Sequence, residues 1–268
     1  MGRPCNNSPM SVRTVRVTRY VTPLREGGSL PAIVEADDDG MYVVKFRGAG
    51  QGARALVAEL VSGEIARALG LPVPEIVFAE LDPELARTEP DPEIFALIRD
   101  SAGLNLALDY LPGSVMFDPV VETPADELAS RIVWFDAYVM NVDRTPRNPN
   151  MLMWHRQLWL IDHGASLYFH HTPGWESGRD RARDAFPPIK DHVLLRRASL
   201  LPRVDEDLAR RLTPEVIAGV LDLVPDAWLE GETSTDAARA RSAYRQYFTG
   251  RLSAPRAFVE EAMRVRGA

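Results

Sequence analysis

The chain has 268 residues, of which 46% are hydrophobic and 26% are charged. These proportions are typical of a folded globular protein and exclude a collagen, a coiled coil or a disordered chain. The formal net charge of -7 argues against nucleic acid as the main partner, because phosphate backbones attract basic surfaces.

Residues 1–10 are polar and predict a disordered tail without the apolar run of a signal peptide. No later window has enough consecutive apolar residues for a membrane span. The single cysteine, Cys5, allows no internal disulfide, which fits a reducing compartment. We therefore expect a cytoplasmic protein that does not contact a membrane.

The first part of the chain, residues 11–112, predicts a β-rich lobe. Its β-branched and aromatic runs favour strands, and Asp37 to Gly40 has the composition of a hairpin turn. Apolar residues spaced near 3.6 predict one helix, and Gly70 stands where a helix C-cap is expected. The expected strands are 12–20, 31–35, 41–46, 75–81, 94–99 and 104–111, and the expected helix is 52–69.

The second part, residues 113–268, predicts a helical lobe after the break at Pro112-Gly113-Ser114. Its first helix should start at an N-cap, Thr123, with Pro124 at the first helical position, and run to Met140. Two short apolar runs, 151–154 and 158–161, predict a hairpin, and most of the chain after 213 predicts helices. The expected fold is α+β and two-lobed, with a mixed antiparallel β N-lobe and a mostly helical C-lobe in one catalytic unit.

Chemistry-bearing residues gather in the loop after that helix and at the end of the hairpin. Asp143 precedes Asn148 by five residues, and Asp162 ends an apolar strand just before Gly164. Because a hairpin lies between Asn148 and Asp162, the second acid should return beside the loop. One amide and one carboxylate are suitable ligands for Mg²⁺ when phosphates complete its coordination.

A lysine in the N-lobe completes a set of groups suited to phosphoryl transfer. All but two of the 31 basic residues are arginine, and the exceptions are Lys45 and Lys190. Lysine is a compact point charge, so Lys45 in its strand is a candidate to neutralise phosphate. Glu59 and Glu64 lie on the following helix, and either could hold it. Phosphoryl transfer needs such a lysine, metal ligands and an acid that orients the attacking hydroxyl.

These residues resemble the HipA-like kinases, within the wider protein-kinase-like and phosphoinositide-kinase-like fold. The resemblance runs through Asp143 to Asn148, the Asp162-His163-Gly164 triplet and the segment from Glu59 to Pro74. It implies ATP and Mg²⁺ as cofactors. It further implies Asp143 as the catalytic acid, Asn148 and Asp162 as metal ligands, and Lys45 as the phosphate lysine paired with Glu59. It also implies a linker whose backbone binds adenine, Asp109-Tyr110-Leu111.

Some features depart from the family or stay open. The triplet has His163 where protein kinases have phenylalanine. HipA toxins carry a further N-terminal subdomain, so the toxin role is not carried over. Gly27 and Gly28 fit either a loop that covers phosphates or a plain hairpin turn. Lys190 could contact substrate, pair with Asp143 or form a structural salt bridge.

The sequence thus predicts an ATP- and Mg²⁺-dependent kinase that phosphorylates a hydroxyl of a protein (Ser/Thr) or another acceptor. Two alternatives remain. One is a small-molecule kinase of the aminoglycoside-phosphotransferase type, which an acidic substrate cleft would favour. The other is a pseudokinase that binds nucleotide or acts as a scaffold without turnover. The acceptor, a protein or a small molecule, is not identified by any motif.

Overall fold

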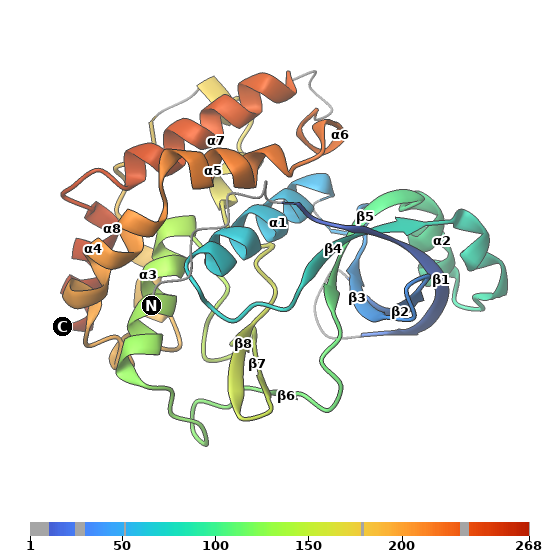
Figure 1. Cartoon of the computed structure of the whole chain (residues 1–268), viewed down its shortest axis with the longest axis horizontal. Coiled ribbons are helices and arrows are strands. Elements are labelled where there is room, and N and C mark those ends of the chain that lie inside the picture. Colours follow the sequence, from blue (N-terminus) through green and yellow to red (C-terminus); the bar gives the residue numbers. More distant parts are fainter. Residues whose placement is uncertain (1–10, 25–29, 51, 178–179, 231–235, 268) are drawn as a thin grey trace, which may run out of the picture.

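A computed structural model describes residues 11–24, 30–50, 52–177, 180–230 and 236–267, so the expected tail 1–10 lies outside the described part. The protein has mixed α+β structure, with a β barrel on one side and most of the helices on the other (Figure 1). The strands are β1 (Thr14–Pro23), β2 (Ala32–Ala36), β3 (Met41–Lys45), β4 (Ile76–Leu81), β5 (Gly103–Asp109), β6 (Val115–Met116), β7 (Met151–Trp154) and β8 (Gln157–Leu160). The α-helices are α1 (Ala53–Ala68), α2 (Pro92–Asp100), α3 (Asp126–Val139), α4 (Leu201–Arg211), α5 (Pro214–Asp222), α6 (Asp226–Leu229), α7 (Ala237–Arg251) and α8 (Ala257–Arg266).

The barrel consists of β1, β2, β3, β5 and β4 in that order. Neighbouring strands are antiparallel except β1 and β4, which are parallel and place Thr14 opposite Phe78. Side chains alternate between the two faces of a strand, and buried Val34, Val44 and Val77 belong to the barrel core. The predicted antiparallel sheet therefore closes through one parallel pair, which leaves no free edge.

The strand predicted at 94–99 is wrong, because this segment forms α2. The Asp91 side chain accepts a hydrogen bond of 3.0 Å from the Glu93 amide, and Pro92 occupies the first turn of the helix. These are helix-start signals, and Ile94 and Ile98, four residues apart, both pack into the barrel core. The Asp-Pro-Glu sequence therefore outweighed the β-branched residues that had suggested a strand.

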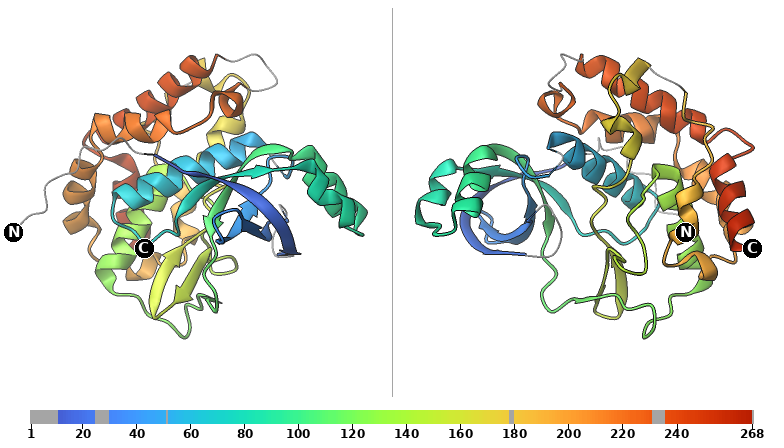
Figure 2. Two further views of the ribbon diagram at one scale, coloured as in Figure 1. Left: turned by 45° about the vertical axis from the view of Figure 1, so that its right-hand side comes forward. Right: turned by 180° about the vertical axis from the view of Figure 1, so that it is seen from behind.

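The larger core lies on the helical side and includes α1. Buried residues of α1 and α3 join those of α4, α5, α7 and α8 in one continuous cluster. In Figures 1 and 2, α1 lies between the barrel and the C-terminal helices, in line with its packing against α5 and α6. Lys45 ends the barrel strand β3 and Glu59 lies on α1. The position of α1 beside the barrel therefore sets the distance between these two side chains.

The predicted start of α3 is also wrong. The helix begins at Asp126 with Ala125 at the N-cap, and neither Thr123 nor Pro124 belongs to it. The Asp126 carboxylate accepts a hydrogen bond of 2.6 Å from the Ser199 hydroxyl and lies at the positive end of the helix dipole. The helix ends where Met140 adopts a left-handed conformation, with φ of 54°, and the chain turns into the loop that carries Asp143.

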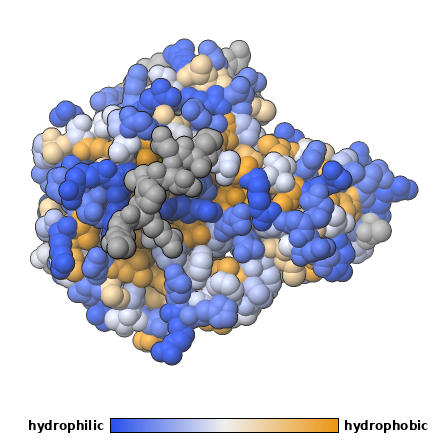
Figure 3. Space-filling model, viewed as in Figure 1, coloured by the Kyte–Doolittle hydropathy of each residue, from blue (hydrophilic) through white to orange (hydrophobic). Residues whose placement is uncertain are grey.

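The predicted hairpin is present as β7 and β8, and β6 adds a third strand. Figure 2 shows this small sheet beside the barrel and below α1. On the face shown in Figure 3, hydrophilic residues cover most of the surface and hydrophobic groups form smaller patches. No helix in the described part of the chain is long and apolar enough to span a membrane.

Candidate active site

Lys45, at the end of β3, meets two acids that are distant in sequence. Its Nζ donates a hydrogen bond of 2.7 Å to Glu59 Oε2 and also pairs with Asp162 Oδ1. The Glu59 side chain on α1 is fully buried, whereas the Asp162 side chain is 47% exposed. Glu64 lies one turn further along α1 and is 3.6 Å from Arg67. Lys45 therefore pairs with Glu59 and not with Glu64.

The electrostatics of this cluster keep Lys45 and Glu59 charged. Burial would raise the pKa of Glu59, but attraction to Lys45 prevails and lowers it to about 2. Burial would lower the pKa of Lys45, but Glu59 and Asp162 together raise it above its ordinary value. At neutral pH the structure thus holds the Lys45 ammonium group beside the exposed side chain of Asp162.

The loop after α3 brings Asp143 together with two amides. Asp143 Oδ2 accepts hydrogen bonds of 2.8 Å from Asn148 Nδ2 and 3.3 Å from Asn150 Nδ2. Burial and the nearby charge of Asp162 raise the pKa of Asp143, while the two amides oppose the rise. Asn150 was not predicted from the sequence as a site residue, although it follows Asn148 by two positions. Asp143, Asn148 and Asp162 thus form one group.

A second ionic network holds this loop from behind, and the sequence did not reveal it. Asp136, fully buried on α3, accepts hydrogen bonds of 2.6 Å from Arg144 Nε and 2.9 Å from Asn141 Nδ2. His192 Nε2 lies 2.9 Å from the same carboxylate. Burial would raise the pKa of Asp136, but Arg144 and His192 lower it to about 2. The signal was an acid inside the apolar run 132–139 of α3, where a buried carboxylate requires a buried cation.

Arg144 also connects the loop to the strand end that carries Asp162. Its Nη1 donates to the carbonyl oxygens of Asn150 and Ile161, the latter at 3.5 Å. The Ile161 amide in turn donates to the Asn150 carbonyl at 3.1 Å. One buried guanidinium therefore fixes the position of Asp162 relative to Asn148.

The donor set fits a divalent ion that receives further ligands from a phosphate chain. Asn148 Oδ1 and Asp162 Oδ2 accept no hydrogen bond from any described residue, so both oxygens are available. Within the described ranges there is also no group of three or more His, Cys, Asp or Glu side chains able to hold a metal alone. One amide and one carboxylate match Mg²⁺, which keeps water or phosphate oxygens in its remaining positions.

The linker after β5 presents one free backbone donor. The Asp109 and Tyr110 amides donate to the carbonyls of Glu75 at 2.8 Å and Met41 at 3.0 Å. The Leu111 amide donates to no acceptor among the described residues. Of the three linker residues predicted from the sequence, Leu111 is thus the one whose N–H remains able to donate a hydrogen bond to a ligand.

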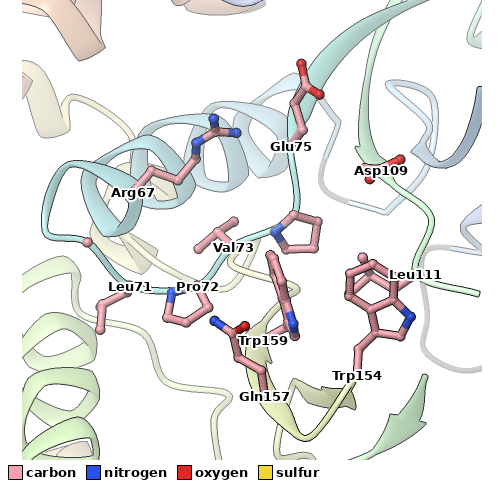
Figure 4. A pocket seen from close by; sticks show the side chains of 12 residues that line it. Arg67, Leu71, Pro72, Val73, Glu75, Asp109, Leu111, Trp154, Gln157 and Trp159 are labelled. Atoms are coloured by element: carbon pink, nitrogen blue, oxygen red, sulfur yellow. The ribbon is translucent and has the colours of Figure 1, made fainter.

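A cavity of about 540 Å³ lies beside this linker. Figure 4 shows Trp154 and Trp159 facing it from the hairpin, with Leu111 beside them and Glu75 and Asp109 above. None of the catalytic candidates lines this cavity. It is therefore separate from the cluster around Lys45 and Asp143. The other predicted residues, Gly27 and Gly28, lie outside the described part, and their role stays a prediction.

His163 fills an internal position next to the ion pair. Its side chain is fully buried, with the ring edge-on to Phe135 at 5.7 Å and Nδ1 3.4 Å from Glu59 Oε1. Neither ring nitrogen has a hydrogen-bond partner among the described residues. The histidine thus packs as a ring in the core beneath α1.

A model of the HipA-like kinase family matches residues 17–246. The chain belongs to the HipA-like kinase family. This confirms the family predicted from the sequence.

Two of the solved structures that resemble this chain are structures of kinases. The crystal structure of CtkA, a proinflammatory kinase of Helicobacter pylori, gives a TM-score of 0.54 at 11% identity, over 92% of this chain and 95% of that one. Golgi casein kinase with Mn and ADP bound gives 0.47 at 12% identity, over 92% of this chain and 73% of that one. The likeness to CtkA shows a shared kinase-like fold. A search of curated proteins gives no match.

Proposed function

We propose that this HipA-like kinase binds ATP with a divalent metal ion and transfers the γ-phosphoryl group to an acceptor hydroxyl. The observation that carries the proposal is the convergence of Lys45, Glu59 and Asp162 beside Asp143 and Asn148. These groups come from the barrel, α1, the loop after α3 and the end of the hairpin. Phosphoryl transfer needs this combination of fixed charges and oxygen ligands.

In this proposal each residue has a separate task. Lys45, held by Glu59, neutralises the phosphates, and Asp143 orients the attacking hydroxyl and accepts its proton. The Leu111 amide donates to the adenine edge from the linker between an N-lobe, residues 11–112, and a C-lobe, residues 113–268. Burial raises the pKa of Asp143, which makes the carboxylate a better proton acceptor.

Asn148 and Asp162 would hold the metal ion, for which we propose Mg²⁺. When bound, the ion supplies positive charge that stabilises the phosphate oxygens during transfer. Asp162 also touches Lys45, so the same carboxylate joins the metal ligands to the phosphate lysine. The single cysteine of the chain supports a reducing compartment, and we place this activity in the cytoplasm.

The test of this function is the Asp143→Asn variant. We expect phosphoryl transfer, followed as ATP turnover or autophosphorylation with labelled ATP, to fall by about a thousandfold or more because the proton acceptor is lost. The affinity for Mg²⁺-ATP should change by less than about twofold, since Asp143 contacts no nucleotide in the proposal.

The matched control is Asp222→Asn, which removes an exposed carboxylate at the end of α5. It should turn over ATP as the wild type does. Full activity in Asp143→Asn would contradict the assigned role of this residue. A wild-type protein that binds Mg²⁺-ATP but transfers phosphate to no acceptor, including water, would favour the pseudokinase alternative.

A further inference from the structure

A second cavity, of about 800 Å³, lies directly beside the loop that carries Asp143. Residues 145–147 of that loop form one wall, residues 190–196 form another, and the end of α8 completes it. The Val193 amide donates a hydrogen bond of 3.1 Å to the Arg144 carbonyl, and His192 lies 2.9 Å from Asp136. The wall is therefore fixed to the network that positions the catalytic loop.

The cavity is lined by basic side chains that have no ionic partner in the described part of the chain. Arg147, Lys190, Arg196 and Arg266 line it, and all are exposed. None of these four side chains forms an ion pair or a hydrogen bond with a described residue. Among the described residues that line the cavity, Asp191 is the one with a carboxylate. Many other arginines in this chain, with its net charge of -7, do have acidic partners, such as Arg13, Arg19 and Arg256.

We infer that this cavity binds an acidic segment of a protein acceptor and so presents a neighbouring hydroxyl to Asp143. The inference rests on the proposed kinase function and names the acceptor class for the same site. Free cations beside the catalytic loop would form charge-assisted hydrogen bonds with aspartate, glutamate or phosphorylated side chains. Lys190, the second of the two lysines, thereby contacts substrate and does not pair with Asp143.

The mixed lining of the cavity and the overall charge of the molecule favour a short polypeptide segment over an extended anionic surface. Membranes and nucleic acids present extended negative surfaces, which a protein with a net charge of -7 repels outside a local patch. Apolar residues, Pro146, Val193, Leu195 and Val265, line the cavity together with the bases and suit the mixed surface of a peptide. A cationic acceptor such as an aminoglycoside would be repelled here.

The experiment measures peptide binding directly, without requiring transfer. The probe is a fluorescein-labelled pool of serine peptides with flanking positions randomised between aspartate and glutamate, and the matched pool carries asparagine and glutamine instead. With Mg²⁺ and a non-hydrolysable ATP analogue present, fluorescence anisotropy should show at least about tenfold tighter binding of the acidic pool. That preference should weaken as salt is added, because exposed charges are screened.

The variant Lys190→Glu/Arg196→Glu should weaken binding of the acidic pool by about tenfold or more and leave Mg²⁺-ATP affinity within about twofold. The control Arg239→Glu/Arg245→Glu makes the same change of charge at exposed positions on α7, away from the cavity. It should bind the acidic pool as the wild type does. Retained nucleotide binding shows that each variant is folded.

Three results would overturn the inference: equal binding of the two pools, an equal loss in both double variants, or tighter binding to phosphatidylserine vesicles than to the acidic pool. Failure of the kinase function is a different result, namely no binding of Mg²⁺-ATP by the wild type in calorimetry. A protein that binds the acidic pool but no nucleotide would contradict the proposed function and leave the cavity as a peptide site.

Discussion

Two ionic networks, each with a buried acid, adjoin the loop that carries Asp143, and they differ in how far they reach solvent. In each, a fully buried acid, Glu59 or Asp136, has its pKa lowered to about 2 against the effect of burial. The network of Lys45 is open, since the side chains of Lys45 and Asp162 are 15% and 47% exposed. The network of Arg144 is sealed, since its side chain is 0% exposed.

This difference in exposure distinguishes a network that can contact a ligand from a network that holds the loop in place. The sealed network uses both oxygens of Asp136 on groups of the protein itself, Asn141, Arg144 and His192, and thereby fixes the loop. The open network leaves Asp162 Oδ2 without a partner among the described residues, next to the ammonium group of Lys45. Burial of a charge alone therefore does not identify a candidate site residue. An oxygen without a partner next to solvent is the better indication.

The largest effect should follow from Asp136→Asn, which neutralises the acid of the sealed network. We expect a loss of about 3–5 kcal/mol in the free energy of unfolding at pH 7, because the Arg144 charge stays buried without a counter-ion. The measurement is urea denaturation of the wild type and the variant. As a control, Asp207→Asn removes a half-exposed acid that pairs with Arg131 and Arg211, and it should cost less than about 1 kcal/mol.

The same pair of proteins should show a defined pH dependence. The folded pKa of Asp136 is about 2 and lies below its unfolded value of about 3.9, so its contribution is fully present above pH 4. It is lost as pH falls toward 2. The stability difference between wild type and Asp136→Asn should therefore narrow over this interval, and a constant difference would contradict the assigned ion network.

A smaller effect should follow from Glu59→Gln in the open network, compared with Glu64→Gln on the same helix. Loss of the Glu59 charge should lower kcat/KM for ATP by about ten- to a hundredfold, since Lys45 then keeps only Asp162 as a partner. Glu64 contacts Arg67 and not Lys45, and its variant should differ from wild type by less than about twofold. An equal loss of kcat/KM in the two variants, measured by steady-state kinetics, would contradict the distinction between Glu59 and Glu64.

The sequence revealed most of the candidate site because three of its residues stand at short spacings. Asp143, Asn148 and Asp162 lie in or near one loop and one hairpin, so local reasoning brings them together. Lys45 stood out as one of two lysines among 31 basic residues. The choice between Glu59 and Glu64 needed the family resemblance, because both acids follow the strand at similar distance.

The remaining features depend on contacts between distant segments. His192 reaches Asp136 across 56 positions, and no local pattern indicates that pairing. The parallel pairing of β1 with β4 closes the barrel without a turn that would signal it. The basic cavity likewise combines three separate segments, the loop after α3, residues 190–196 and the end of α8.

The most direct test of the account is calorimetric titration with ATP, with and without Mg²⁺, of the wild type and the Asp162→Ala variant. The account predicts that tight binding requires Mg²⁺ in the wild type and that the Mg²⁺-dependent part disappears in the variant. Asp162 is half-exposed, so its removal should leave the fold intact. Equal Mg²⁺-ATP affinity in the two proteins, or no binding in either, would contradict the proposed nucleotide site.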